Sequence, residues 1–174
     1  MEFSMPASGE IYIGQWTPDL AGELSRLSLD ADNRAYLPDE VFETAQEAAD
    51  AIAQLLAFQH NGAGPQVYPV FEADGRFIGH VEISPLDDGG KDWEIGYHIG
   101  AEYRGHGYAA AAVRLFMPHI MDKMALSRLW GICHAENKAS KRVLEKCGFS
   151  MCDQKSVMYF GKPAEIHRYI YERT

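Results

Sequence analysis

Glycines gather at residues 97–111, where a strand-like pattern changes to a helical one. The segment reads Tyr97-His-Ile-Gly-Ala-Glu-Tyr-Arg-Gly-His-Gly-Tyr-Ala-Ala-Ala. A strand that turns through glycine into a helix points several backbone N–H groups, and the positive end of the helix dipole, at one place. Gly105 and Gly107 lack a Cβ, so the backbone there could approach a phosphate closely. The segment predicts either a phosphate site or an ordinary glycine-bearing connection.

Known phosphate-binding patterns differ in what accompanies the glycines. A P-loop is excluded, because no Lys-Ser or Lys-Thr pair follows these glycines. The dinucleotide pattern G-x-G-x-x-[GA] is met formally by Gly105, Gly107 and Ala110, but the acid expected about 20 residues later is not clearly present. The better match is [QR]-x-x-G-x-[GA], a pyrophosphate loop, which is met by Arg104, Gly107 and Ala109.

Four motifs in this order resemble the GNAT superfamily of N-acetyltransferases, most closely the branch of ribosomal-protein alanine acetyltransferases. They are Trp93-Glu-Ile-Gly-Tyr-His-Ile99, Tyr103-Arg-Gly-His-Gly-Tyr-Ala109, Asn137-Lys-Ala-Ser140 and Glu145-Lys-Cys-Gly-Phe149. The resemblance covers nearly the whole chain. It implies acetyl-CoA as co-substrate and direct transfer of the acetyl group to a primary amine. The acceptor stays open among a protein N-terminus, a polyamine, an aminoglycoside and another small, cationic amine, and the spacing of the histidines and cysteines indicates no metal.

The same resemblance implies where the co-substrate binds. The amides of residues 105–109 would hold the pyrophosphate, Arg104 would offer it a planar donor fork, and the pantetheine would pair with the backbone of residues 97–99. The cofactor-binding residues expected in this way are Tyr97, His98, Ile99, Arg104, Gly105, His106, Gly107, Tyr108, Ala109, Asn137 and Ser140.

Glu94 and Ser140 are the expected catalytic residues. Glu94 shares a strand face with His98, so it is either the general base for the amine, acting through a water, or a surface acid paired with Lys or Arg. Ser140 is either the acid that protonates the leaving thiolate or a first-turn serine that bonds the backbone. Tyr97 and Tyr103 are weaker candidates for the acid.

Other polar residues near these motifs have less specific readings. Asn137 is expected as a helix N-cap, a pantetheine ligand or both. His98 could be a second base or orient Glu94, His106 offers mainly its amide, and Cys133 is interpreted as a buried strand cysteine. A solvated basic rim is expected from Lys138, Lys141 and Arg142. The remaining histidines lack metal-ligand spacing and are interpreted as structural: His60, His80, His119, His134 and His167.

Hydrophobic periodicity predicts the elements that position these groups. Strands are expected at 10–16, 67–72, 76–84, 93–99, 129–133, 149–153 and 156–172, and helices at 19–29, 44–61, 109–124 and 137–146. We expect one α/β domain over residues 1–174, with a mixed, largely antiparallel sheet, flanked by about four helices. From the resemblance we expect that sheet to splay between strands 4 and 5.

Three local features carry expectations of their own. Residues 30–41 are acidic and loop-like, with Pro38 as a breaker. Pro69 within a strand suggests an edge position or a bulge. Pro118 should kink or shorten the helix that follows the phosphate loop.

Charge is distributed unevenly along the 174 residues. The formal net charge of −9 disfavours nucleic acid and anionic membranes as partners. Residues 1–60 hold 11 acidic and two basic residues, whereas residues 104–146 hold eight basic and three acidic ones. This is either a chance difference between solvated surfaces or a sign of an anionic ligand at one end and a cationic one at the other. A cationic acceptor or basic peptide would meet Asp30, Asp32, Asp39, Glu40 and Glu43.

Composition disfavours several broad classes of protein. Three cysteines without a CxxC pair favour neither a disulfide scaffold nor a zinc site, no apolar run is long enough for a membrane helix, and residues 1–5 do not resemble a secretory leader. We therefore expect a cytoplasmic monomer or homodimer. The alternatives to an acetyltransferase are a non-catalytic CoA-binding or sensor module on the same fold and, less favoured, a dinucleotide-binding oxidoreductase.

Overall fold

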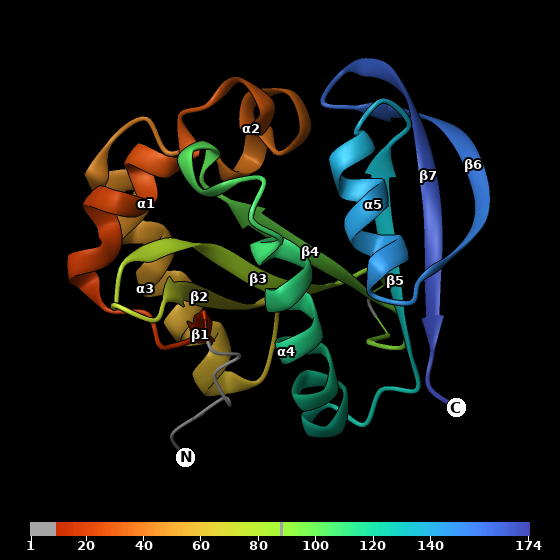
Figure 1. Ribbon diagram of the computed structural model, residues 1–174, viewed down its shortest axis with the longest axis horizontal. Coiled ribbons are helices and arrows are strands. Elements are labelled where there is room, and N and C mark those ends of the chain that lie inside the picture. The colour runs from red at the N-terminus through yellow and green to blue at the C-terminus, as the bar shows by residue number, and fades with distance from the viewer. Residues whose placement is uncertain (1–9, 88) are drawn as a thin grey trace.

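The computed structural model describes residues 10–87 and 89–174, which form one seven-stranded sheet and five α-helices (Figure 1). The expectation about residues 1–5 lies outside the described residues. The strands are β1 (Ile11–Ile13), β2 (Gln66–Glu72), β3 (Phe77–Pro85), β4 (Trp93–Ile99), β5 (Arg128–His134), β6 (Ser150–Tyr159) and β7 (Lys162–Glu172). The helices are α1 (Ala21–Ser28), α2 (Ala31–Tyr36), α3 (Ala45–Asn61), α4 (Tyr108–Lys123) and α5 (Lys138–Lys146), and the 3-10 turns are η1 (Pro18–Leu20), η2 (Pro38–Glu40) and η3 (Ala101–Tyr103).

The sheet has the order β1-β2-β3-β4-β5-β7-β6, and every neighbouring pair is antiparallel except β4 and β5. That parallel pair joins at a single position, Glu94 opposite Trp130. Beyond Glu94, β4 continues to Ile99 with β3 as its partner and no ladder to β5. The predicted mixed sheet that splays between strands 4 and 5 is therefore confirmed.

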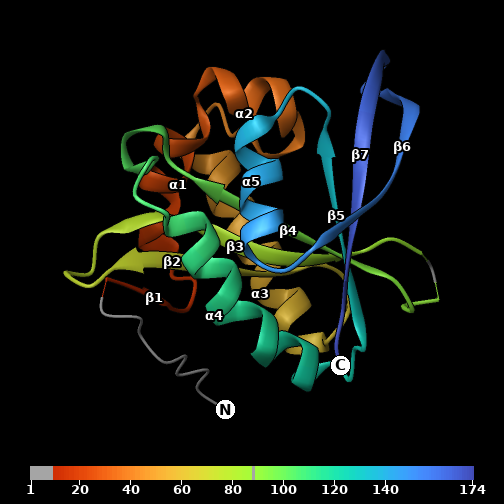
Figure 2. The same cartoon turned by 45° about the vertical axis from the view of Figure 1, so that its right-hand side comes forward.

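Helices cover both faces of the sheet, with α1 and α3 on one face and α4 and α5 on the other (Figures 1 and 2). The two faces have separate hydrophobic clusters. One is centred on Ile52 of α3 and Phe77, and the other on Phe116 of α4 and Ile78. Because β2 is covered on both sides, all of its residues from Gln66 to Phe71 are buried. Strand β3 contributes to both clusters, whereas β4 contributes to the α4/α5 cluster only.

The acidic segment 30–41 is not the loop that its composition predicts. It contains α2 and η2, and Asp30 caps α2 by accepting a hydrogen bond from the Asn33 amide at 3.0 Å. The Asn33 side chain is buried and donates to the Ser28 carbonyl at 3.2 Å. The helix was missed because it is short and is held by its cap and buried asparagine rather than by an apolar stripe.

The structure treats the expectations for Pro118 and Pro69 differently. Helix α4 runs to Lys123 with Pro118 inside it, so the shortening, one of the two expected effects, is wrong, and the kink stays a prediction. Met117 and Met121 are buried on either side of the proline, and their packing holds the helix across the lost hydrogen bond. Pro69 does not lie on an edge strand, because β2 has partners on both sides, but the register shifts one residue later, at Val70/Phe71, as the bulge alternative predicts.

The last two strands meet at a tight turn that periodicity misplaced. Strand β6 extends to Tyr159, and the turn is formed by Phe160 and Gly161 with φ of 47° and 77°. Such left-handed pairs suit a two-residue hairpin. In the described part of the chain, no helix is long and apolar enough to cross a membrane.

Candidate active site

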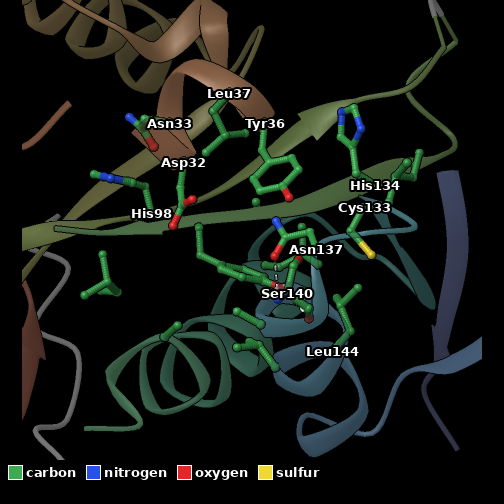
Figure 3. Close-up of a pocket in the computed structure, with 18 of the residues that line it drawn as sticks. Asp32, Asn33, Tyr36, Leu37, His98, Cys133, His134, Asn137, Ser140 and Leu144 are labelled. Atoms are coloured by element: carbon green, nitrogen blue, oxygen red, sulfur yellow. Dashed lines mark hydrogen bonds between the residues drawn. The ribbon is translucent and has the colours of Figure 1, made fainter. Parts of the chain in front are cut away.

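A cavity of about 640 Å³ opens where β4 and β5 separate. Its walls come from the end of α2, the loop before α4, the first turns of α5, and the turn between β6 and β7. Figure 3 shows Tyr36 and Leu37 on one side of it and Asn137 and Ser140 on the other. The splay therefore creates an open site in the middle of an otherwise packed sheet.

The loop at residues 104–108 has the backbone shape that a phosphate site needs. Gly105 and Gly107 have φ of 83° and 79°, which L side chains rarely adopt, and a Cβ at either would meet no atom within 4 Å. Gly107 is the N-cap of α4. Within the described residues, the amides of 105–110 donate to no protein acceptor, as expected at a helix start. These amides are free to bind an anion.

Arg104 belongs to this loop, but its guanidinium is engaged elsewhere. Its Nε donates to the Ile99 carbonyl, and its two terminal nitrogens donate to Asp32 and Asp30, each bond measuring 2.9 Å. The arginine thus fastens the loop to the start of α2. Its role as a phosphate ligand stays a prediction.

The other expected loop residues separate into two groups. Tyr108 and Ala109 line the cavity, whereas the His106 side chain does not. The His106 ring stacks on Tyr108 with centroids 5.4 Å apart, and the Tyr108 hydroxyl donates to Glu72 at 2.9 Å. His106 can therefore contribute its amide, as expected, but not its imidazole.

Ser140 and Tyr97 are brought together by the fold. Their hydroxyl oxygens lie 2.8 Å apart, and either can donate. The Tyr97 hydroxyl also lies 3.1 Å from the Ser140 carbonyl. Burial raises the pKa of Tyr97 well above its usual value, so its phenol stays protonated. Asn137 caps α5 by accepting from the Ser140 amide at 3.1 Å, which confirms the expected N-cap.

Glu94 lies in the same cavity, on β4 close to the point where the strands part. Burial raises the pKa of Glu94 to about 7. The negative charges of Glu40 and Asp39 also raise this pKa, whereas a hydrogen bond from the Ile132 backbone lowers it. No Lys or Arg among residues 10–87 and 89–174 forms an ion pair with it. The alternative in which Glu94 is an acid paired with Lys or Arg is therefore wrong for the described residues.

His98 is buried on the same strand face, two residues beyond Gly96. Burial lowers the pKa of His98, and its Nε2 lies 3.6 Å from the Asp30 carboxylate, too far for a hydrogen bond. In the described structure it makes no hydrogen bond to Glu94. His98 therefore faces α2 rather than orienting the candidate base.

The remaining sequence candidates are placed as follows. Cys133 is buried in β5 and lines the cavity, and burial raises the pKa of its thiol, which favours the protonated form. Tyr103 and Arg142 also line the cavity, whereas Lys138 and Lys141 do not.

Of the five acids expected to meet a cationic acceptor, three line the cavity: Asp32, Asp39 and Glu40. Asp30 pairs with Arg104, and Glu43 pairs with Arg34 outside the cavity.

Sequence reasoning missed several cavity-lining residues, among them an acid, a glycine and two tyrosines. Glu82, Gly96, Tyr36 and Tyr159 all line the cavity. Glu82 lies opposite Gly96 in the β3–β4 register, and that register was the signal available, since the hairpin places alternate residues of both strands on one face. His80, which the sequence favours as a structural histidine, is buried, and its Nε2 lies 2.9 Å from the Glu40 carboxylate.

Comparison with known proteins agrees with this geometry. Residues 11–150 match the acetyltransferase (GNAT) domain. The chain belongs to the GNAT acetyltransferase family. Among curated GNAT relatives, an uncharacterized N-acetyltransferase of Bacillus subtilis, YnaD, is 29% identical over 120 residues, which is 68% of this chain and 66% of that protein. The spermidine N(1)-acetyltransferase of Escherichia coli K12 is 28% identical over 69% of this chain and 64% of its own length. These alignments thus span just under two thirds of each relative.

Among solved structures, the ribosomal L7/L12 alpha-N-protein acetyltransferase RimL, in complex with coenzyme A, has a TM-score of 0.82 with 19% identity, and 98% of each chain is covered. At that identity the likeness shows the GNAT fold.

Proposed function

We propose that this protein transfers an acetyl group from acetyl-CoA directly to a primary amine. The observation that carries the proposal is the cavity at the β4–β5 splay. Its wall holds a carboxyl group, Glu94, that forms no ion pair with any described Lys or Arg, and a hydroxyl pair, Tyr97 and Ser140. A reaction that removes a proton from an amine and returns one to a thiolate needs both kinds of group.

The residues present fit acetyl-CoA. The unbonded amides of residues 105–110 and the positive end of α4 suit a pyrophosphate, and the left-handed glycines leave the space above them open. The backbone of β4 beyond Glu94 has no ladder partner on its β5 side, so residues 97–99 can pair with an extended amide-bearing chain. CoA in the RimL structure and the spermidine acetyltransferase relative support this assignment.

Glu94 would act as the general base. With a pKa of about 7 it is about half ionised at neutral pH and mostly ionised above it, and it is basic enough to take a proton, directly or through one water, as the amine attacks the thioester carbonyl. The new C–N bond forms while the C–S bond breaks, and the electron pair leaves on sulfur. Ser140 would return a proton to that sulfur, with Tyr97 re-supplying the serine oxygen.

The test is acetyl transfer by the purified chain. Acetyl-CoA is incubated with a panel of small amines, polyamines and peptides with free N-termini, and free thiol and acetylated product are both measured. We expect product from at least one amine, and a loss of roughly 10²–10⁴-fold in turnover for Glu94→Gln. Glu172→Gln is the matched control, because Glu172 is exposed at the end of β7 and does not line the cavity.

Two outcomes would overturn the proposal. Acetyl-CoA binding without product from any amine would indicate a CoA-binding or sensor module. Calorimetric binding of a nicotinamide dinucleotide in place of acetyl-CoA would indicate the oxidoreductase instead.

A further inference from the structure

Strands β3 and β4 present a row of polar residues on the face that meets the cavity. In their register His80 lies opposite His98, Glu82 opposite Gly96, and Ser84 opposite Glu94. Along the strands, Glu82 therefore lies between the candidate base, Glu94, and the buried pair His80 and His98. The proposed chemistry uses Glu94 and leaves Glu82 without a role.

Gly96 explains where the Glu82 carboxylate lies. A Cβ built on Gly96 would come within 2.6 Å of Glu82 Oε1 and 2.8 Å of its Cγ. The Glu82 side chain thus lies over Gly96 of β4, in the space that a side chain at position 96 would fill. Glycine at this position lets the carboxylate reach the cavity, which both residues line.

A second carboxylate meets it from the opposite element. Glu40, in η2, accepts a hydrogen bond from His80 Nε2 at 2.9 Å, and one polar side-chain atom each of Glu40, His80 and Glu82 lie within 4.8 Å of one another. The Glu40 and His80 side chains are only 21% and 6% exposed. Within the described chain no Lys or Arg forms an ion pair with Glu40 or Glu82. One histidine therefore hydrogen-bonds the Glu40 carboxylate and has the Glu82 carboxyl group within 4.8 Å.

Gathering these carboxyl groups without a cation is costly. Burial raises the pKa of Glu82 well above its usual value, and the charges of Glu40, Glu94 and Asp39 add to the effect. The same wall holds His98, which is 5% exposed and has no hydrogen-bond partner for its Nε2 in the described residues. The protein thus leaves buried polar groups here unsatisfied, and a ligand with several N–H donors would satisfy them.

An ammonium group fits this wall better than a metal ion does. A metal-bound histidine normally donates its second ring nitrogen to an acceptor, but His80 Nδ1 is buried and has no partner among the described residues. An ammonium group has three donors and no acceptor, which matches two carboxylates and leaves one donor for a water or the ligand's neighbour.

We propose that Glu82 and Glu40 bind a second ammonium group of the acceptor, so that the acceptor is a slender aliphatic diamine or polyamine. The inference rests on the proposed acetyl transfer and adds its substrate class. Residues two apart on one strand face lie roughly 6.6 Å from each other, so the subsite at Gly96 and the base at Glu94 suit two nitrogens separated by about four methylene groups.

The cavity wall near α2 favours a slender acceptor. Tyr159, at the end of β6, donates from its hydroxyl to the Tyr36 carbonyl at 2.7 Å, which joins the β6–β7 hairpin to the end of α2. Both tyrosines line the cavity, and Tyr36 points into it in Figure 3. This hydrogen-bonded bridge forms part of the wall that also holds Asp39 and Glu40, and we expect it to admit an unbranched amine more readily than a bulky acceptor.

The test compares 1,4-diaminobutane with butylamine as acceptors, at fixed saturating acetyl-CoA. We expect the wild-type protein to prefer the diamine at least tenfold in kcat/KM. Glu82→Gln should remove most of that preference, because it should raise the KM for the diamine at least several-fold more than the KM for butylamine. Gly96→Ala keeps the charge but displaces the carboxylate, so it should have the same effect.

The outcomes separate this inference from the proposed function. Equal use of both amines by the wild type, or equal losses with both amines in Glu82→Gln, would overturn the subsite while leaving acetyl transfer intact. Acetylation of peptide N-termini but not of the diamine would overturn the substrate class. Transfer to no amine at all would overturn both. The KM for acetyl-CoA and the melting temperature of each variant check that the fold and the donor site are unchanged.

Discussion

The hydroxyl groups of Tyr97 and Ser140 lie 2.8 Å apart, although 43 residues separate them in the chain. Tyr97 comes from β4 and Ser140 from the first turn of α5, so the contact crosses the gap that the splayed sheet leaves open. Two hydroxyls in contact can pass a proton between them. Ser140 could therefore donate a proton and regain one from Tyr97.

Ser140→Ala tests the proposed acid. We expect turnover to fall by roughly 10²-fold, at the low end of the range for general acid catalysis, because the leaving thiolate loses its nearby proton. Acetyl-CoA binding, measured by calorimetry, should change by less than about threefold, since the backbone of α5 is unaffected. Full turnover in this variant would contradict the acid role.

Tyr97→Phe tests the relay. The raised pKa of Tyr97 keeps its phenol protonated through neutral pH, so its loss should slow turnover less than the loss of Ser140 does. The double variant should be no slower than Ser140→Ala alone, because residues acting in one relay are not additive. A double-variant cycle on kcat measures this, and simple multiplication of the two losses would count against the relay.

The pH dependence of turnover tests Glu94. Burial and the charges of Glu40 and Asp39 raise its pKa to about 7. The base must be ionised, so kcat at saturating amine should be full above that pH and fall as pH drops below it. Glu94→Gln should lower kcat and remove this acid limb, and Glu172→Gln should retain it. An unchanged limb in Glu94→Gln would assign the titration to another group.

Gly107→Ala tests the phosphate loop. Its φ of 79° disfavours an L side chain, so we expect a loss of about 1–2 kcal/mol in stability. Gly62→Ala is the matched control, because Gly62 has a φ of 66°, also has no atom within 4 Å of a Cβ, and lies at the end of α3. Both variants should lose similar stability by denaturant unfolding. Only Gly107→Ala should raise the KM for acetyl-CoA, and an equal rise in both would refute the loop assignment.

Asp30 should make stability depend on pH. Burial alone would raise the pKa of Asp30, but His98, the Asn33 amide and Arg104 together hold it well below its usual value. A carboxylate with a depressed pKa stabilises the fold at pH values above its unfolded pKa, and that contribution is lost as pH falls toward the folded one.

We expect Asp30→Asn to lower the free energy of unfolding by about 1–3 kcal/mol at pH 7 and by less near pH 3. The Asp32 side chain is 69% exposed and bonds the same arginine, so Asp32→Asn should cost much less. Denaturant unfolding at the two pH values measures both variants. Equal losses at both pH values would contradict the linkage.

Local features were predictable because their physics is local. The phosphate loop needs left-handed glycines before a helix start, and both features depend on neighbouring residues alone. Asn137 is an N-cap for the same reason. The alternation in residues 93–99 placed Glu94 and His98 on one face, which the structure confirms. Helix α2 escaped prediction because its stability comes from a cap and from buried contacts rather than from its own periodicity.

Sequence by itself determined the order of elements, the glycine loop and the uneven charge, since these follow from residue type and spacing. Only the tertiary structure decided which groups share the cavity. Pairing of β3 with β4 laid Glu82 over Gly96, and the approach of η2 added Glu40. The tertiary structure also places the Arg104 guanidinium in hydrogen bonds with Asp32 and Asp30, more than 70 residues earlier in the chain. Such contacts depend on strand register and on helix packing, which balance many weak interactions across the whole chain and leave no local pattern to read.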